Sequence, residues 1–590
     1  MPSPEGHNPL RAKLALLLAE TLPNVSDEFG SLEAEYLKPQ IERTRDANHG
    51  DFTSNIALRL SKKMSQSPRD LAVEIVAAFP QSKIIEKVEV AGPGFINFTL
   101  TSAAYEHELQ SILTDGSNYG RTTTGTDKRI LLEYVSANPT GPLHVGHGRH
   151  AAYGASLANL LRATGYDVHE EYYVNDAGRQ MDILAASVWL RYAELEDASF
   201  PFPTNAYQGD YVQTIAQNLF ESHGDSLTSR MDSIAMLIND NDIHEEQRLD
   251  RIIAEIKANI GLKNFAIVLN AALGNVLADI KDDLNAFGVV PHKWYSESSL
   301  ADGPIERALE ILDNQKMIYK HDGAKWFKAT DFGDEKDRVV VRENGTTTYF
   351  ASDIAYHLEK CNRGFDLLLD VLGADHHGYV ARVRAGLEAM GQRADCLEVQ
   401  LVQFVTLYRG REKAQMSTRT GEYVTLRQLR NEVGKDAARF FYISQSNNQH
   451  LDFDMELAKS RSNDNPAYYI QYAHARVASL MKKLRAEGAA IEDPAIANLS
   501  LLIEDAEKTL ITALSRYPEV IQLAAANRAP QHLAHYLRDT AAAFHASYNS
   551  HRVLINNHSL RDARVALALA TQQVLRNGLD LLGVSAPETM

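Results

Sequence analysis

Residues 129–174 carry a pattern of strand, loop, helix and strand that few folds can accommodate. Residues 129–135 are a short, mostly apolar run of strand length, residues 151–164 place leucines at helical spacing, and residues 166–174 are again strand-like. A helix that joins two strands in this way makes a right-handed crossover in a parallel sheet. The pattern therefore predicts an α/β fold with a ligand site beyond the carboxyl ends of the strands, where loop 136–150 lies.

The loop contains residues suited to binding a nucleotide. Gly146 and Gly148 lack a Cβ atom, so a base or a phosphate could approach the backbone closely. The start of the following helix offers free N–H groups and the positive end of its dipole. His144 and His147 add imidazole donors, which can stabilise negative charge as it grows on a phosphate during displacement. We predict a nucleotide site in which these two histidines are the catalytic groups.

Two other interpretations of the histidines are open at this point. A histidine close to a helix start often serves as a cap or as a partly buried side chain. His144, His147 and His150 are spaced three apart and could bind zinc, but the sequence lacks the His-Glu-x-x-His pattern. His376 and His377 raise the same question, and a third ligand is missing near them in the sequence. We therefore predict no metal site formed by protein side chains.

Several segments resemble one enzyme family. Segment 136–149 resembles the His-Ile-Gly-His signature of class I aminoacyl-tRNA synthetases, and its flanks are similar to those of bacterial arginyl-tRNA synthetases. Further segments resemble the same family in the same order, namely 172–178, 348–353, 373–378, 416–421 and 462–476. The resemblance implies an enzyme that activates L-arginine with ATP and Mg²⁺ and transfers the arginyl group to the 3′-terminal ribose of tRNA(Arg). A non-catalytic, tRNA-binding relative of such enzymes is the alternative.

The resemblance also implies three domains, and 590 residues exceed what one hydrophobic core usually serves. Residues 1–120 would form a small α/β domain that contacts the tRNA. Residues 121–464 would form the class I catalytic domain, a Rossmann-like parallel sheet with a helical connective insertion at about 177–290. Residues 465–590 would form an all-helical anticodon-binding domain. From their residues alone, the first could equally be a folding or dimer module and the last an interaction module.

The family likeness also assigns residues to the amino acid. A guanidinium is always protonated and presents five donors in a plane, so its site needs carboxylates and other acceptors. The matching residues for the guanidinium and for the backbone end of the amino acid are Glu297, Tyr349 and Asp353, and Glu133, Asn138 and His376, respectively. Without the resemblance, Asp353 could equally be the N-cap of the helix that follows it.

The residues that the resemblance assigns to ATP include a departure from the family pattern. They are Gly146, Gly148, Gly373, Asp375, Lys413, Met416, Ser417 and Arg419. The second class signature, Lys-Met-Ser-Lys-Ser, reads Gln-Met-Ser-Thr-Arg over 415–419, so both lysines are replaced. Lys413, Arg411 and Arg419 are candidates for the charge that pairs with the leaving pyrophosphate. Alternatively, residues 409–413 form a basic hairpin turn at the surface.

Composition and charge constrain the partners and the compartment of the protein less strongly than the motifs do. A net charge of −17 argues mildly against a nucleic-acid partner, because binding phosphates requires Lys and Arg, but a total charge says little about a local surface. The sequence has no run of about eighteen apolar residues, so a membrane span is not predicted. Cys361 and Cys396 form no disulfide framework or zinc pattern and fit a reducing compartment. We expect a soluble, cytoplasmic monomer without a membrane partner.

Overall fold

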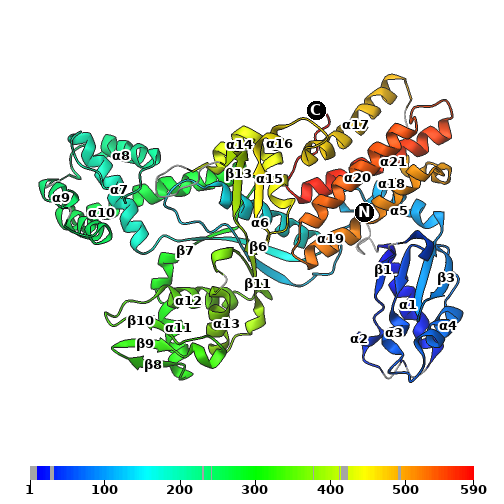
Figure 1. Cartoon of the computed structure of the whole chain (residues 1–590), viewed down its shortest axis with the longest axis horizontal. Coiled ribbons are helices and arrows are strands. Elements are labelled where there is room, and N and C mark those ends of the chain that lie inside the picture. Colours follow the sequence, from blue (N-terminus) through cyan, green and yellow to red (C-terminus); the bar gives the residue numbers. More distant parts are fainter. Residues whose placement is uncertain are drawn as a thin grey trace. The chain divides into compact units, whose positions relative to one another are not determined.

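The structure is a computed structural model that describes residues 9–26, 29, 32–44, 46–228, 231–240, 242–376, 378–410, 412–413, 423–489 and 493–590. Many of its helices and strands are labelled in Figure 1. The chain divides into two compact units. One contains the described residues up to Thr126, then 159–166 and those from 461 onward; the other contains 127–158 and 167–460.

A five-stranded sheet forms the centre of the second unit. Its strands are β5 (Arg129–Glu133), β6 (Asp167–Val174), β7 (Lys293–Ser296), β11 (Leu367–Gly373) and β12 (Leu397–Val402). They follow the order β12-β11-β5-β6-β7, and every neighbouring pair is parallel. Four consecutive residues of β5 are buried, as expected for a parallel strand covered on both faces. The predicted parallel α/β sheet is therefore confirmed.

The helix α6 (Val145–Ala163) connects β5 to β6. It begins within the glycine-rich loop, earlier than residue 151, where the leucine spacing alone places it. The residue before it, His144, accepts a hydrogen bond at Nδ1 from the backbone N–H of Gly146 at 3.0 Å. This bond satisfies one of the free N–H groups at the helix start, so the helix can begin directly after His144.

The remaining elements of the second unit lie between and after these strands in the sequence. The insertion after β6 contains α7 (Arg179–Glu196), α8 (Asp210–His223), α9 (Met231–Ile238) and α10 (Glu245–Ala286). A three-stranded antiparallel sheet has the order β10-β9-β8, with β8 (Ile318–His321), β9 (Ala324–Phe327) and β10 (Arg338–Val341). A second small sheet has the order β14-β13-β15, with β13 (Val405–Arg409), β14 (Glu412–Lys413) and β15 (Leu451–Asp454). The other helices are α11 (Pro304–Asn314), α12 (Tyr349–Asn362), α13 (Tyr379–Ala389), α14 (Leu426–Val433), α15 (Lys435–Ile443) and α16 (Met455–Lys459).

In the part of the chain that the structure describes, α10 is the one helix long and apolar enough to cross a membrane by length and composition. Core helices of soluble proteins pass the same test. Gly261 interrupts α10 with a non-helical backbone (φ 78°, ψ 154°), so the element consists of two helices joined at a kink. The sequence has no uninterrupted apolar run of this length, so α10 is not predicted as a membrane span from such runs.

The first unit combines a small α/β part with a helical part. Its antiparallel sheet has the order β1-β2-β4-β3, with β1 (Ile41–Arg43), β2 (Phe52–Ser54), β3 (Ile85–Ala91) and β4 (Phe95–Leu100). Helices α1 (Leu10–Val25), α2 (Ala34–Leu37), α3 (Ile56–Leu60) and α4 (Pro68–Ala78) belong to the same part. The helical part contains α5 (Ser102–Asp115), α17 (Pro466–Ala486), α18 (Asp505–Ser515), α19 (Tyr517–Ala526), α20 (Gln531–Ser550) and α21 (His558–Leu581).

An ion pair joins the two parts of the first unit. Arg43 at the end of β1 donates through Nε and Nη2 to the two carboxylate oxygens of Glu519 on α19, at 2.9 and 3.0 Å. Both side chains are largely buried, and such a two-pronged pair also fixes orientation. Residues nearly five hundred positions apart are held together by this contact, with an additional hydrogen bond from Arg43 to Ser515.

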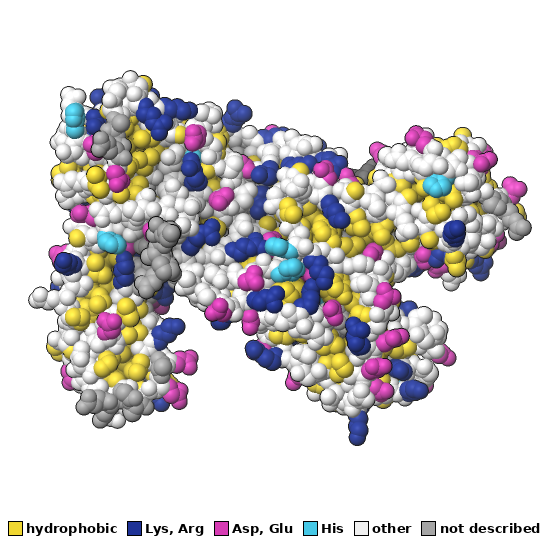
Figure 2. Space-filling model, turned by 180° about the vertical axis from the view of Figure 1, so that it is seen from behind, with side chains coloured by type: hydrophobic (Ala, Val, Ile, Leu, Met, Phe, Trp, Pro, Cys, Tyr) yellow, Lys and Arg dark blue, Asp and Glu magenta, His cyan; other side chains and the backbone are white. Residues whose placement is uncertain are grey.

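Basic side chains lie on the surface although the protein is acidic overall. Figure 2 shows Lys and Arg side chains interspersed with Asp, Glu and apolar side chains over the face that it presents. The net charge of −17 therefore does not exclude local basic surface.

Candidate active site

A cavity of about 560 Å³ opens at the carboxyl ends of the central strands of the sheet. Residues following β5, β11 and β12 line it, together with the first turns of α6 and one face of α12. This is the edge at which parallel α/β sheets bind ligands. Of the residues predicted from the sequence, it brings together Glu133, Asn138, His144, Gly146, His147, Asp353, Gly373, Asp375 and His376.

The two histidines form a stacked pair at the start of α6. Their ring centroids are 3.7 Å apart and the rings are inclined by 20°. Nδ1 of His144 accepts from the N–H of Gly146, and Nδ1 of His147 accepts from the N–H of His144 at 3.2 Å. A neutral ring that accepts at Nδ1 carries its proton at Nε2. Each imidazole therefore has one N–H donor that these backbone bonds leave available.

The pair is held in the neutral state. Burial lowers the pKa of both His144 and His147 below the ordinary value, and the charge of each neighbouring histidine lowers that of His147 further. Burial also lowers the pKa of His150, to about 4. The capping interpretation of His144 and its place in the cavity are thus compatible, because Nδ1 caps the helix while Nε2 remains a donor.

The two glycines of the loop have different surroundings. A Cβ atom on Gly146 would lie 2.8 Å from Cε1 of His144, so a side chain there would displace the imidazole. A Cβ on Gly148 would lie 2.8 Å from both Leu426 and the hydroxyl of Tyr442. Gly146 lines the cavity, whereas Gly148 is buried against these two side chains. Gly148 is therefore packed closely against Leu426 of α14 and Tyr442 of α15.

The backbone after β5 is strained where it enters the cavity. Val135 and Ser136 have φ angles of 73° and 39°, a region that β-branched residues rarely adopt. The side chain of Ser136 holds this turn, because it donates to Glu133 at 2.8 Å and accepts from the N–H of Tyr173 at 3.1 Å. The turn redirects the chain from the buried strand into the lining of the cavity.

Two carboxyl groups predicted to hold the guanidinium have raised pKa values. Burial raises the pKa of Glu297 to about 7, and the charges of Asp353 and Asp176 contribute. Burial also raises the pKa of Asp353 to about 6, although His357 and a hydrogen bond from Tyr379 oppose the shift. The charge of Asp353 is thus one of the causes that raise the pKa of Glu297.

Asp353 is not the cap of its helix. Helix α12 begins at Tyr349, and the side chain of the preceding Thr348 accepts from the N–H of Ala351. Threonine is a favoured capping residue, so the helix already has its cap five residues before Asp353, which lies within the helix. The alternative interpretation of Asp353 from the sequence is therefore wrong.

Glu297 and Tyr349 lie outside the lining of the cavity among the described residues. Glu297 is nearly buried in the short turn that follows β7. Tyr349 is 62% exposed, and its hydroxyl lies close to Gly178 at the start of α7. The three predicted guanidinium ligands thus differ strongly in their access to solvent.

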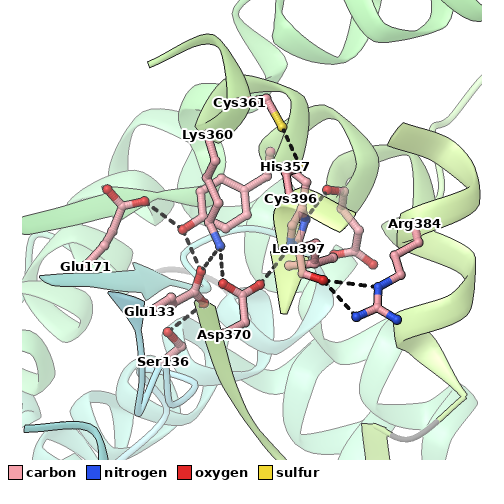
Figure 3. A network of polar contacts seen from close by, with 12 residues as sticks. Glu133, Ser136, Glu171, His357, Lys360, Cys361, Asp370, Arg384, Cys396 and Leu397 are labelled. Carbon is pink, nitrogen blue, oxygen red and sulfur yellow. Dashed lines mark hydrogen bonds and ion pairs between the residues drawn. The ribbon is translucent and has the colours of Figure 1, made fainter. Parts of the chain in front are cut away.

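Glu133 belongs to a buried network that Figure 3 shows from close by. Its Oε2 accepts from Nζ of Lys360 at 2.6 Å and from the hydroxyl of Tyr356 at 2.7 Å. Lys360 also donates to Asp370 at 2.8 Å, and Asp370 interacts with Nε2 of His357 at 2.8 Å. The parallel register of β5 and β11 places Glu133 directly beside Asp370, so the lysine compensates two neighbouring carboxylates.

The members of this network on α12, Tyr356, His357 and Lys360, were not predicted from the sequence. Asp353, His357 and Lys360 are spaced by four and three residues, so they share one face of the helix. Tyr356 and His357 line the cavity beside Asp353. The helical spacing in the sequence indicates this polar face. The spacing does not reveal that the face contacts Glu133 of β5 and Asp370 of β11.

The residues predicted to contact the nucleoside lie at the far end of β11. Gly373 ends the strand, and a Cβ there would lie 2.5 Å from Oδ1 of Asp375. The side chains of Asp375 and His376 are 66% and 51% exposed and 3.7 Å apart. Asn138 is also exposed within the lining. These polar groups are available to a ligand from the solvent side.

The second signature lies mostly outside the described residues. Arg411, Met416, Ser417 and Arg419, like His377, are among the residues that the structure does not describe. Lys413 is exposed on β14, which pairs with β13 as an antiparallel hairpin. The described part of 409–413 thus pairs Arg409 with Glu412 at the surface, and Arg411 lies outside the described residues.

Comparisons with known proteins agree on one family across the whole chain. The catalytic-domain model described as tRNA synthetases class I (R) matches residues 108–459. The arginyl tRNA synthetase N terminal domain model matches 12–100, and the DALR anticodon binding domain model matches 470–590.

Individual relatives cover nearly the full length. The arginine–tRNA ligase of Thioalkalivibrio sulfidiphilus is 53% identical over 557 residues, which are 93% of this chain and 95% of the relative. That of Halorhodospira halophila is 52% identical over 585 residues, covering 98% and 100%. A solved arginyl tRNA synthetase from Campylobacter jejuni has a TM-score of 0.73 at 30% identity and covers 83% of this chain and 100% of that chain. The Thermus thermophilus arginyl-tRNA synthetase, at 23% identity, covers 98% of this chain and 100% of that chain and shares its fold with a TM-score of 0.74.

These matches confirm the resemblance seen in the sequence, and the cavity lies in the segment that the catalytic-domain model matches. The chain belongs to the class I arginyl-tRNA synthetases, the ATP-dependent ligases that join arginine to tRNA(Arg).

Proposed function

We propose that this cavity binds arginine and ATP together, with the guanidinium near Asp353 and Glu297 and the phosphates near His144 and His147. The observation that supports this most is the contrast within one cavity, where neutral imidazole donors and Asp353, an acid of raised pKa, occupy different parts of the lining. Glu297 lies outside the lining, and the charge of Asp353 contributes to its raised pKa. A guanidinium requires carboxylates, and a phosphate requires hydrogen-bond donors.

The reaction needs no nucleophile from the protein. A carboxylate oxygen of arginine attacks the α-phosphorus of ATP, the bond to the pyrophosphate oxygen breaks, and arginyl-adenylate forms. A hydroxyl of the 3′-terminal ribose of the tRNA then attacks the carbonyl carbon, and AMP leaves. The Nε2–H groups of His144 and His147 stabilise the charge on the phosphate without having to reorganise, because the backbone fixes both rings.

Glu133 retains capacity for the α-ammonium group of arginine. Its two oxygens offer about four acceptor positions. Lys360 and Tyr356 occupy two positions on Oε2, and Ser136 occupies one on Oε1. One position on Oε1 therefore remains, on the edge that lines the cavity. Asn138 and His376, both exposed in the lining, complete the proposed contacts to the backbone end of the amino acid.

The nucleotide is assigned to the end of β11 and the start of α6. Gly146 and Gly373 permit close approach of ATP, and Asp375 is available to the ribose hydroxyls. Gly148 supports this loop by packing. Lys413, Arg419, Met416 and Ser417 keep their proposed place at the pyrophosphate. ATP enters as its Mg²⁺ complex, since Mg²⁺ is held largely by substrate phosphates and water.

The proposed working state is a single copy of the chain in the cytoplasm. The described residues that line the cavity all belong to one compact unit, so a single copy of this unit can form the cavity. The low cysteine content of the chain, two residues, fits a reducing compartment. Light scattering after gel filtration measures the mass in solution directly, and a dimer would overturn the monomer.

Arginine binding should weaken as the pH falls. A guanidinium binds the ionised carboxylate, whereas Glu297 and Asp353 take up protons with pKa values of about 7 and about 6. Below these values a bound proton must be released before arginine binds. Lowering the pH from about 8 to about 6 should raise the dissociation constant roughly twentyfold if the two acids act independently. Equilibrium dialysis with labelled arginine on the full chain measures this dependence.

The variant Glu297→Gln separates the two acids. It removes the group with the higher pKa, so the remaining dependence should be about twofold between the same pH values. Glu310→Gln, at an exposed site on α11, is the matched control and should keep the parent profile. A parent protein whose arginine affinity is constant over this range would contradict the assignment of the two acids to the guanidinium.

A further inference from the structure

The only two cysteines of the chain lie against each other beside the buried network. Their Sγ atoms are 3.7 Å apart, a contact drawn in Figure 3. Cys361 is near the end of α12, and Cys396 ends the short turn Ala394–Cys396 that leads into β12. Both side chains are partly exposed and pack against the hydrophobic core of the unit. Residues 35 positions apart thus place two thiols in contact, within reach of small solutes.

We propose that Cys361 and Cys396 form a redox-modification site, a dithiol that hydroperoxides convert into an intramolecular disulfide, and that this disulfide lowers aminoacylation activity. The site is separate from the substrate contacts, because neither cysteine is among the residues that line the cavity. The inference therefore goes beyond the ligase function and does not depend on the roles proposed for the acids and histidines.

The surroundings favour one thiol as the attacking group. Either sulfur could donate in this contact; with Cys361 as the donor, the contact favours the thiolate of Cys396 and lowers its pKa, an effect that burial and Asp395 oppose and Arg393 supports. The same contact raises the pKa of Cys361. Because the thiolate is the nucleophile, Cys396 is the first to react and Cys361 resolves the product.

The chemistry balances with one hydroperoxide. The Cys396 thiolate attacks the terminal peroxide oxygen, the O–O bond breaks, and a sulfenic acid forms while the alcohol or water leaves. The sulfur of Cys361 then attacks the sulfenic sulfur, its proton goes to the departing hydroxide, and water leaves as the S–S bond forms. Two thiols are oxidised and the peroxide is reduced. A thiol reductant reverses the modification.

The disulfide should disturb elements that line the cavity. An S–S bond is about 2.05 Å long, so the sulfurs must approach by roughly 1.7 Å from their 3.7 Å contact. Lys360 precedes Cys361 and is fixed by Glu133 and Asp370. Leu397 follows Cys396, and its carbonyl accepts two hydrogen bonds from Arg384. Because these contacts hold the neighbouring residues, we expect part of the shift to be transmitted to α12 and β12.

These two elements carry substrate-facing residues. Asp353, Tyr356 and His357 of α12 line the cavity, and so does Val402 at the end of β12. A misplacement of about 1 Å can reduce catalysis by up to about a hundredfold. We expect the oxidised protein to lose on the order of tenfold or more of its aminoacylation activity.

The experiment uses the full chain, fully reduced and then treated with increasing hydrogen peroxide. Aminoacylation of tRNA(Arg), free thiols and the peptide map are followed in parallel. The expected result is a linked peptide that contains Cys361 and Cys396, formed in proportion to the lost activity. Dithiothreitol should restore activity and remove the linked peptide.

Single-cysteine variants provide the matched controls. Cys361→Ser and Cys396→Ser should each retain the parent's activity when reduced and resist the peroxide dose that inactivates the parent. Two variants are used so that a folding defect in one leaves the other as the test. Three results would overturn the proposal: no linked peptide in the oxidised parent, a linked peptide with full activity, or inactivation of both variants to the parent's extent.

Discussion

Replacing Lys360 with methionine should destabilise the unit that contains the active site by about 3–5 kcal/mol, because two buried carboxylates would lose their common partner. The Lys360 side chain is fully buried, with Nζ at 2.6 Å from Glu133 and 2.8 Å from Asp370. Burial by itself lowers the pKa of Lys360, but Asp370 and Glu133 outweigh it and raise the pKa, so the lysine is charged. Methionine has a similar length and cannot compensate either acid.

Tryptophan fluorescence is suited to this measurement. The three tryptophans of the chain, Trp189, Trp294 and Trp326, all lie in the unit that contains residues 167–460. Urea unfolding followed by their fluorescence therefore reports on this unit. Lys320→Met, at an exposed position on β8, is the control and should change the free energy of unfolding by no more than about 0.5 kcal/mol. An equally small change for Lys360→Met would show that the network carries little of the stability.

Replacing His144 with asparagine should reduce the rate of adenylate formation by about 10²–10³, the loss typical of one preorganised donor at a developing negative charge. His144 has two separate roles in the structure: Nδ1 caps α6, and Nε2 remains a donor in the cavity. Asparagine is a good N-cap residue and keeps the first, but it is too short to place a donor where Nε2 lies. The loss should appear in catalysis while the helix start stays intact.

Arginine-dependent exchange of labelled pyrophosphate into ATP measures adenylate formation. The assay is run with and without tRNA, and lysine in place of arginine is the control for specificity. His144→Ala should show the same catalytic loss plus a loss of stability of about 0.5–2 kcal/mol, because alanine also removes the cap. Binding of tRNA should be nearly unchanged in both variants. Unchanged exchange in His144→Asn would remove His144 from the catalytic site.

Local patterns in the sequence predicted much of the catalytic core. The buried run of β5, the helical spacing of α6 and the second strand β6 are properties of consecutive residues, and the structure contains all three. Their boundaries were less accessible. The start of α6 depends on the cap by His144, and the start of α12 depends on the cap by Thr348, where the sequence also allowed Asp353.

The active-site residues also divide into those that local sequence predicts and those that it does not. His144, Gly146 and His147 belong to one loop, so their meeting in the cavity follows from local sequence. The proximity of Glu297 to Asp353 could be inferred only through the family, since each residue is also plausible as a surface acid. The exposed Tyr349 could not be placed from its pattern, because its exposure depends on what packs beside α12.

The sequence by itself determined the family, the parallel α/β class and the nucleotide loop, because motifs and periodicity are carried by residues close together in the chain. Only the tertiary structure decided that Lys360 meets Glu133, 227 positions away, and that Cys361 meets Cys396. Such contacts depend on strand order and register, here the pairing of β5 with β11 and of β11 with β12. Side-chain pairing across separate elements leaves no local period, so it becomes visible only once the sheet has brought the elements together.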